Sequence, residues 1–218
     1  MTVSVDIDLG YEFAVKAPFK EVFALLADVP RSASHFPKVK KLHDLGDNAY
    51  RWEMQKVGTA QVGIQTIYSC KYKSDEKKGS ITWAPHKDDK ANAQISGSWK
   101  ITEGKGRTNV VLKTGGTVDV ALPALMKLIV VPVVTSEFEG LVEKYIENLC
   151  QALGGEVEPV RAHRRLGLQQ HDLGRLGREP PRLLERRARV DDVAALVQRP
   201  GEPGEGLGVG RVLLGAGL

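Results

Sequence analysis

The chain has 218 residues, of which 27% are charged and 6% aromatic, and its formal net charge is +4 at pH 7. This length allows one domain with a substantial core, or one domain and an appendage. Residues 1–159 carry 20 basic and 20 acidic side chains, so the positive excess lies wholly in residues 160–218. We therefore expect no nucleic-acid partner for the first and longer part of the chain.

The first predicted element is a strand over residues 3–15. Apolar side chains alternate there with polar or small ones, which is typical of a strand with one buried face. The apolar positions are Val3, Val5, Ile7, Leu9, Tyr11, Phe13 and Val15. From Pro18 the apolar spacing changes to i, i+3, i+4, i+7, which predicts an amphipathic helix that ends before Pro30. Residues 31–37 allow one further short helix.

Alternation returns after residue 38 and predicts six more strands, connected as hairpins through turn-forming segments. These strands are expected at residues 39–44, 50–55, 62–73, 81–85, 94–101 and 109–120. A long helix is then expected to begin near Leu122 or Pro123 and to end at Gly154, because apolar residues recur at helical spacing between them. Pro132 is expected to kink this helix or to divide it, with a second start capped near Ser136.

The composition changes abruptly after residue 150. Residues 151–218 contain only ten residue types, and the codons of all ten can begin with G or C. A GC-rich gene that is read one frame away from its true frame produces this bias. We therefore predict a folded domain over residues 1–155 and a frameshifted or disordered segment over residues 156–218, of which residues 160–218 add no stability. The alternative is an arginine-rich arm that binds RNA, a ribosome or an anionic membrane.

The expected order is one strand, two short helices, six antiparallel strands and one long helix. A sheet with one apolar face needs a cover, and the C-terminal helix is long enough to provide it. We therefore predict an α+β fold of the helix-grip type, in which a seven-stranded curved antiparallel sheet wraps around the C-terminal helix and two short helices follow the first strand. Because a curved sheet cannot follow a straight helix along its whole length, we expect an apolar gap between them.

Two stretches resemble the START-like superfamily, also called SRPBCC, whose fold is the helix grip. The stretch "FAVKAPFKEVFALLADVPRSASHFPKVKKL" (residues 13–42) is similar to the family's first strand, its pattern A-P-x-x-x-V-F/W-x-x-L-x-D and the short helix that follows. The stretch "ALPALMKLIVVPVVTSEFEGLVEKYIENL" (residues 121–149) is similar to its closing helix. The resemblance covers about residues 1–155 and implies the fold, which hosts lipid-transfer domains, coenzyme Q-binding proteins and polyketide cyclases alike.

Three functions are open under this resemblance. The first is binding or transport of a hydrophobic small molecule, such as a lipid, an isoprenoid quinone or a polyketide, in the gap between sheet and helix. The second is a polyketide cyclase or dehydratase, and the third is a ribosome-associated or other protein-interaction module. The inward positions of the strands include no carboxylate, His, Lys or Arg, so we predict no catalytic residue, and the residues favour the first function.

The candidate ligand-binding residues are the inward positions of the strands and of the early part of the long helix. They are Trp52, Met54, Ile64, Tyr68, Tyr72, Trp83, Trp99, Thr114, Leu125 and Ile129. Tryptophans in such positions more often belong to an ordinary core than to a ligand platform, and the hydroxyls of Tyr68 and Tyr72 suit either a ligand carbonyl or water. A strand bulge would instead turn Arg51, Glu53 and Gln65 inward.

His35 and His43 are candidate bases, His35 near the expected mouth of the gap, although a solvated histidine has the same signature. The sequence contains no metal-binding spacing of His and Cys, and we expect neither a metal nor a cofactor. Cys70 and Cys150 form no disulfide framework, which predicts a reducing, cytoplasmic location.

Two lysine-rich segments, residues 38–41 and 73–78, are the remaining charged features of the first part of the chain. The simplest interpretation is a pair of solvated edges. Lysine clusters also attract anionic lipid headgroups, so a transient contact with a membrane surface is the alternative.

Overall fold

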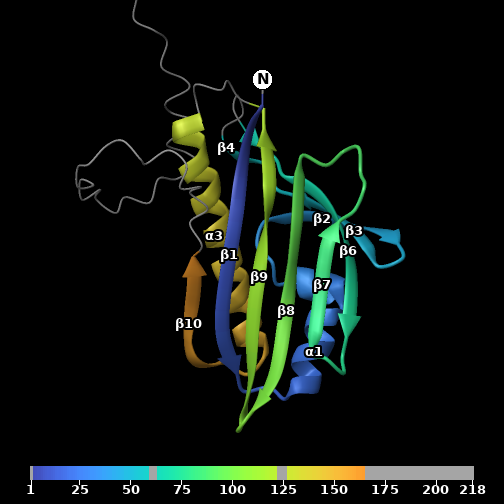
Figure 1. The fold of residues 1–218 in the computed structure, drawn as a ribbon, viewed down its shortest axis with the longest axis vertical. Helices are drawn as coiled ribbons and strands as arrows, with labels where there is room; N and C mark the ends of the chain where they lie inside the picture. The colour runs from blue at the N-terminus through green and yellow to red at the C-terminus, as the bar shows by residue number, and fades with distance from the viewer. Residues whose placement is uncertain (1, 59–62, 122–126, 165–218) are drawn as a thin grey trace, which may run out of the picture.

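The computed structural model describes residues 2–58, 63–121 and 127–164 (Figure 1). The helices are α1 (Phe19–Ala27), α2 (Val29–Ala33) and α3 (Lys127–Ala152). The strands are β1 (Val3–Val15), β2 (Val39–Gly46), β3 (Ala49–Met54), β4 (Val57–Gly58), β5 (Gly63–Ile64), β6 (Ile67–Asp75), β7 (Ser80–Pro85), β8 (Ala93–Gly104), β9 (Arg107–Val120) and β10 (Glu156–Arg164).

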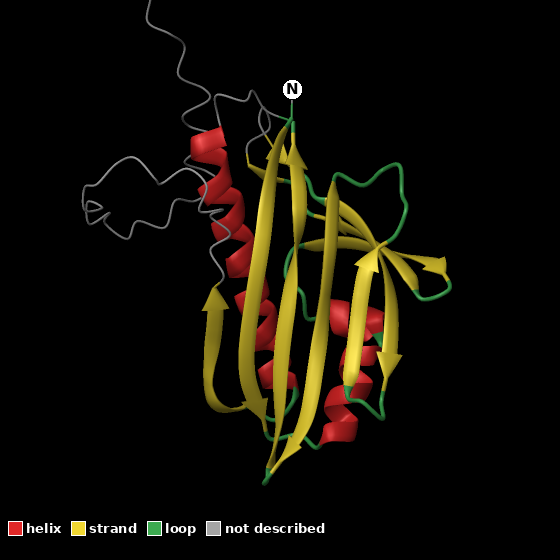
Figure 2. Ribbon diagram, viewed as in Figure 1, coloured by secondary structure: helices red, strands yellow, loops and turns green. Residues whose placement is uncertain are grey.

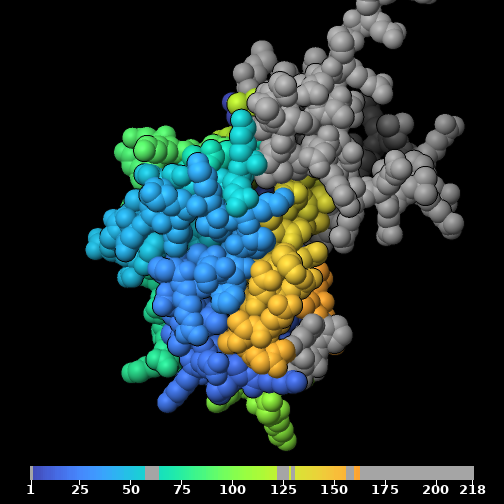
Figure 3. All heavy atoms as spheres, turned by 180° about the vertical axis from the view of Figure 1, so that it is seen from behind, coloured from blue at the N-terminus to red at the C-terminus, as the bar shows by residue number. Residues whose placement is uncertain are grey.

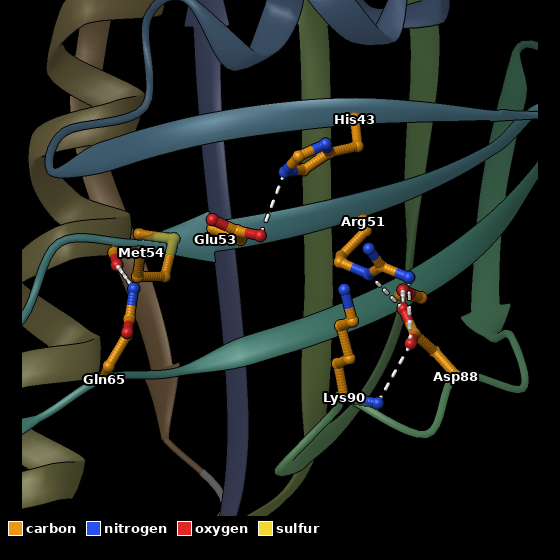
Figure 4. A network of polar contacts seen from close by, with 8 residues as sticks. His43, Arg51, Glu53, Met54, Gln65, Asp88 and Lys90 are labelled. Atoms are coloured by element: carbon orange, nitrogen blue, oxygen red, sulfur yellow. Dashed lines mark hydrogen bonds and ion pairs between the residues drawn. The ribbon is translucent and has the colours of Figure 1, made fainter.

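The strands form a large antiparallel sheet and a small two-stranded one (Figure 2). The large sheet has the order β10-β1-β9-β8-β7-β6-β3-β2, and β4 pairs with β5 in the small sheet. In Figure 4, β2, β3 and β6 run across the direction of β1 and β9, so the large sheet curls around its inner face. The predicted fold class, a curved antiparallel sheet with a long C-terminal helix, is confirmed.

The inner face of the sheet follows the alternation in the sequence. All seven apolar positions predicted for β1 are buried, from Val3 (3% exposed) to Val15 (0%). β9 pairs with β1 over the whole length of β1 without a register shift, from Val3 opposite Val120 to Val15 opposite Thr108. Because the side-chain period of a strand is two, this unbroken register keeps the apolar sets of both strands on one face.

The short helices α1 and α2 close one end of the curled sheet. Pro18 precedes α1 with an extended backbone, α1 lies against β8, and its buried side chains are Val22, Phe23, Leu25 and Leu26. The side chain of Asp28 then accepts a hydrogen bond from the backbone N–H of Arg31 at 3.0 Å and caps α2. This new cap, with proline near the start of α2, explains why the chain forms two helices rather than one.

The long helix α3 covers the inner face next to β1, and its outer side is part of the surface in Figure 3 (yellow to orange). Its buried side chains are Val133, Val142, Tyr145, Ile146, Leu149 and Cys150. Of the two outcomes expected at Pro132, division of the helix with a second start near Ser136 is wrong, because Pro132 lies inside one continuous helix. Gly154 and Gly155, with φ of 81° and 98°, follow the helix end as expected, whereas the predicted start near Leu122 lies outside the described residues.

One predicted strand is divided in the structure. The sequence predicts a strand over residues 62–73, but Gly63–Ile64 belongs to β5 and β6 begins only at Ile67. The side chain of Asn92 accepts a hydrogen bond from the backbone N–H of Ile67 at 2.7 Å. A side chain therefore satisfies the backbone group at the start of β6, and the strand ladder need not continue toward β5.

The strand β10 lies in the segment that the sequence assigns to the unstructured tail. It pairs antiparallel with β1, from Leu9 opposite Arg164 to Val15 opposite Glu156, with two register shifts. Without β10, β1 would present a free edge of backbone N–H and C=O groups, and an extended segment can pair with such an edge. The large sheet thus has eight strands rather than seven, and structured chain continues past residue 155. Residues 165–218 lie outside the described part, so the prediction for them stays a prediction.

Candidate ligand-binding site

Two adjacent cavities lie between the inner face of the sheet and α3. Each has a volume of about 60 Å³, counted as the space that the centre of a water-sized sphere can reach. The first is lined by Leu26, Val29, Ser32, Phe36, Trp52, Tyr68, Tyr72, Ile81, Trp83, Ile95, Trp99, Leu112, Thr114, Phe138, Val142 and Tyr145. The second is lined by Phe36, Lys38, Met54, Gln55, Ile64, Thr66, Tyr68, Val118, Val134, Glu137, Phe138 and Leu141. On this measure one water needs roughly 10–15 Å³, so each cavity has room for a few waters.

Three aromatic side chains line both cavities and separate them. They are Phe36 from the loop after α2, Tyr68 from β6 and Phe138 from α3. Phe36 contacts the ring of Trp52 at a centroid distance of 5.8 Å and the ring of Tyr145 at 4.9 Å. Because these three rings are the part of the lining that the cavities share, their positions decide whether the interior contains two small spaces or one larger space.

Packed rings from four strands and from α3 form the walls of the first cavity. Trp52 stacks on Tyr68 at 5.7 Å, with 9° between the ring planes. Trp99 contacts Trp83 at 6.3 Å and Tyr145 at 6.1 Å. Such ring pairs add to the stability that apolar burial provides and hold each ring in a defined orientation. The cavity therefore has rigid, flat and largely apolar walls.

The few polar groups in the first cavity bond mainly to one another. The hydroxyls of Ser32 and Tyr145 are 2.5 Å apart, and Trp52 donates from Nε1 to the hydroxyl of Tyr72 over 3.1 Å. Burial raises the pKa of Tyr145 to about 12, although the hydrogen bond with Ser32 acts in the opposite direction. Burial also raises the pKa of Tyr72 well above its ordinary value. These phenols are therefore neutral near pH 7 and serve as hydrogen-bonding groups rather than as bases.

The lining of the first cavity contains no Asp, Glu, His, Lys or Arg among the residues that the structure describes. General acid–base catalysis needs a group that gains and loses a proton near the operating pH, and phenols with raised pKa values do not provide one. In the described ranges, no three His, Cys, Asp or Glu side chains come together in a way that suits a metal ion. The arrangement can bury an apolar molecule and offer it hydroxyl groups.

An ion pair between Lys38 and Glu137 lies at the rim of the second cavity. Lys38 has a φ of 56°, and its carbonyl accepts a hydrogen bond from the backbone N–H of Gln55 at 2.7 Å. Since both charged side chains remain partly exposed, the pair adds little to stability. It does connect the loop that carries Phe36 with the helix that carries Phe138.

The structure places eight of the ten predicted ligand-binding residues at these cavities. Six of them line the first cavity: Trp52, Tyr68, Tyr72, Trp83, Trp99 and Thr114. Met54 and Ile64 line the second, together with Tyr68. Leu125 lies outside the described residues, and so does the side chain of Ile129 in α3. The prediction that Trp52 and Trp99 face one shared interior is confirmed.

The sequence prediction missed the residues that the short helices and the middle of α3 contribute to the cavities. Phe138, Val142 and Tyr145 follow the spacing i, i+4, i+7, so the helical period already marked them as one apolar face. Ser32 and Phe36 have no such signal. They lie in a five-residue helix and in the loop after it, where tertiary packing rather than periodicity sets the direction of a side chain.

The charged residues of β3 that were considered for an inward position face the outer side (Figure 4). The pairing of β3 with β6 contains no register shift, so Arg51 and Glu53 lie on the face opposite to Trp52. Glu53 pairs with Nε2 of His43 at 2.9 Å on that outer face. The alternative in which a bulge turns Arg51 and Glu53 inward is therefore wrong.

Gln65 and His35 also lie outside both cavity linings. The side-chain amide of Gln65 donates to the carbonyl of Met54 at 3.0 Å, which continues the contact between the ends of β3 and β6. The carbonyl of His35 accepts a hydrogen bond from the side chain of Asn148 in α3 at 2.8 Å. The loop before β2 is thus attached to α3 through the backbone of His35, and its imidazole does not face the cavity.

Arg51 belongs to a polar cluster on the outer face that ties the β7–β8 loop to β3 and β6 (Figure 4). Both carboxylate oxygens of Asp88, whose side chain is 4% exposed, accept hydrogen bonds from the guanidinium of Arg51. Asp88 also accepts from the hydroxyl of Ser69 at 2.5 Å and from the backbone N–H of Lys90 at 3.0 Å. The Arg51 guanidinium holds the pKa of Asp88 far below its usual range.

We expect this cluster to make the stability of the fold depend on pH in the acid range. A carboxyl whose pKa is lower in the folded chain than in the unfolded chain stabilises the fold at pH values above its unfolded pKa of about 3.9. This stabilisation is lost as the pH falls from there toward the pKa of the folded chain. Asp88→Asn should therefore be less stable than the wild type at pH 7, with the difference shrinking toward about pH 3. Urea unfolding at both pH values measures the difference in stability between the variant and the wild type. Asp89→Asn, which changes the exposed neighbouring carboxylate, is the control. An equal effect of the two substitutions would contradict the role of Asp88.

No family model and no curated protein sequence matches the chain, whereas solved structures do. A conserved protein from Geobacillus kaustophilus is 12% identical, with 72% of this chain and 99% of that chain covered and a TM-score of 0.52. The Zhui aromatase/cyclase from Streptomyces sp. R1128 is 20% identical, with 70% and 92% covered and a TM-score of 0.45. A START superfamily protein from Mycobacterium smegmatis is 14% identical, with 70% and 96% covered and a TM-score of 0.45.

At these identities the likeness concerns the fold alone, and the Geobacillus protein shares it most clearly of the three. None of the helices in the described residues is both long enough and apolar enough to span a bilayer. The curled antiparallel sheet, the two short helices after β1 and the long helix against the inner face together form a helix grip. The chain therefore has the helix-grip fold that its sequence predicts.

Proposed function

We propose that the chain binds a hydrophobic small molecule between α3 and the inner face of the sheet. One observation carries the proposal: the centre of the fold contains unfilled space lined mainly by aromatic and aliphatic side chains. Protein interiors are normally packed as densely as organic crystals, and atoms that border an empty apolar space lose their contacts. Ligand sites have this composition, with a few polar groups that fix the orientation of the ligand. Lipids, isoprenoid quinones and polyketide-like molecules all meet the apolar requirement.

A ligand of this kind needs the two cavities to join, because each alone holds only a few waters. Phe36 lies in the loop after α2 and Phe138 lies in α3, and both side chains line both cavities where this loop meets the helix. Movement of the loop that carries Phe36 away from α3 would open this contact and separate Lys38 from Glu137. This loop is held against α3 by the partly exposed ion pair, which adds little stability, and by the hydrogen bond from Asn148 to the carbonyl of His35, so we assign ligand entry to the route between the loop and α3.

Filling the cavities from α3 tests the proposal. Val142 lines the first cavity and Val134 the second, and phenylalanine at either position would occupy the space. We expect Val142→Phe and Val134→Phe to reduce the binding of N-phenyl-1-naphthylamine, whose emission rises in apolar surroundings. Val131→Phe is the matched control, because Val131 packs against the core on the same helix but lines neither cavity.

Overpacking of a core costs about 1–3 kcal/mol, so the fold of each variant must first be verified by circular dichroism. Folded Val142→Phe and Val134→Phe chains that bind the dye as well as wild type does would contradict the proposal. Equal losses in all three variants would contradict it too, since the dye would then respond to α3 in general. Organic extraction of the purified chain followed by mass spectrometry complements this test by identifying any ligand that accompanies the protein.

A further inference from the structure

The hydroxyl of Tyr68 is a polar group at the cavities for which the fold itself provides no hydrogen bond. Tyr68 is 7% exposed, lines both cavities and stacks on Trp52. No residue in the described ranges forms a hydrogen bond with its hydroxyl. Every side-chain N or O atom that is sealed from solvent in those ranges does have a partner. The Tyr68 hydroxyl is therefore not sealed, and it borders the unfilled space at the junction of the cavities.

A second donor lies beside the indole N–H of Trp52. The hydroxyl of Tyr72 accepts the indole N–H of Trp52 at 3.1 Å, which occupies its oxygen and leaves its own proton free to be donated. Tyr145 differs, because its hydroxyl is already engaged with Ser32 at 2.5 Å. Burial raises the pKa values of Tyr68 and Tyr72 well above the ordinary value, so both phenols keep the proton that they would donate.

The acceptor that fits these donors is neutral. The described lining of the first cavity contains no cationic side chain, and the one lysine at the second cavity, Lys38, is paired with Glu137. A carboxylate in this interior would lose its hydration without gaining a counter-charge, which is strongly unfavourable. A neutral carbonyl oxygen accepts hydrogen bonds and carries a far smaller desolvation penalty.

We propose that the ligand carries a neutral carbonyl oxygen, that Tyr68 donates the hydrogen bond that orients it, and that Tyr72 is the second donor. This inference rests on the proposed function and adds to it the chemical class of the ligand. The apolar walls bind the hydrocarbon part of a ligand without regard to its direction. The hydroxyls of Tyr68, at the junction, and of Tyr72, in the first cavity, would then select ketones, esters and quinones over hydrocarbons of the same shape.

Acetophenone and ethylbenzene form a matched pair for the test, because they differ mainly in a carbonyl that replaces a methylene. Isothermal titration calorimetry on the full chain compares both ligands in the wild type and in Tyr68→Phe, which keeps the ring that stacks on Trp52. We expect the substitution to weaken acetophenone binding about threefold to tenfold and to leave ethylbenzene binding unchanged. Tyr50→Phe, which removes a phenol outside both linings, should affect neither ligand.

The infrared carbonyl band of bound acetophenone provides a second readout, since a hydrogen bond lowers its frequency. The band should lie lower in the wild type than in Tyr68→Phe, and Tyr72→Phe should produce a similar change if Tyr68→Phe does not fold. Binding of both ligands with equal changes in Tyr68→Phe, or with none, would overturn the carbonyl inference and leave the proposed function standing. Failure of the wild type to bind either ligand would overturn the proposed function, and this inference with it.

Discussion

Replacing Leu149 with alanine should lower the free energy of unfolding by about 2–5 kcal/mol. Leu149 is completely buried in the last turn of α3, where it belongs to the core that the helix forms with the sheet. Alanine removes apolar area from that core and leaves a cavity that the surrounding rigid strands cannot close. The effect is large because Leu149 is 0% exposed, so the whole side chain loses its contacts with the core.

The matched control uses the same substitution at the other end of the same helix. Leu128 is 89% exposed, and Leu128→Ala should change the free energy of unfolding by less than about 0.5 kcal/mol. Urea unfolding followed by circular dichroism measures both values on the full chain. Similar losses in the two variants would contradict the claim that burial of Leu149 against the sheet is what stabilises the fold at this position.

Replacing Gly97 with alanine should destabilise the fold by about 1–3 kcal/mol and also remove ligand binding. Gly97 lies on the inner face of β8, opposite Trp83 in the ladder with β7. A Cβ atom at this position would lie 2.3 Å from the Trp83 ring and 2.4 Å from the backbone oxygen of Lys113. The ring or the strand must therefore move, and the wall of the first cavity moves with it.

Ser98→Ala controls for the replacement of a neighbouring residue of β8, since the side chain of Ser98 points to the outer face. This variant should retain both the stability of the wild type and its binding of N-phenyl-1-naphthylamine. If Gly97→Ala binds the dye with wild-type affinity, then Trp83 is not part of the binding site and the first cavity is only a packing defect.

The sequence was sufficient for the fold because its strands alternate cleanly. The register of β1 against β9 keeps every predicted apolar position of β1 inside, and the same alternation in β3, β6 and β8 brought Trp52, Tyr68 and Trp99 to one interior. Period two fixes the face of a side chain wherever a strand is not bulged, so these inward positions followed from sequence alone.

The parts of the structure that the sequence did not predict depend on contacts between distant segments. β10 forms because β1 offers a free edge, and no feature of residues 156–164 by itself indicates a strand. Phe36 enters the cavity lining from a loop, and its position depends on the rings of Trp52 and Tyr145. The two small cavities also cannot be predicted from the pattern of polar and apolar residues, because their existence depends on how closely side chains pack.

The central claim, that an apolar molecule binds between α3 and the sheet, has a direct optical test. All three tryptophans of the chain, Trp52, Trp83 and Trp99, line the first cavity, so the whole tryptophan emission originates at the proposed site. N-phenyl-1-naphthylamine absorbs at the wavelengths at which tryptophan emits, and bound dye quenches that emission by energy transfer. Titration of the folded wild-type chain should give saturable quenching with one dye per chain. Tryptophan emission that stays constant, or that falls in proportion to dye without saturation, would contradict the claim.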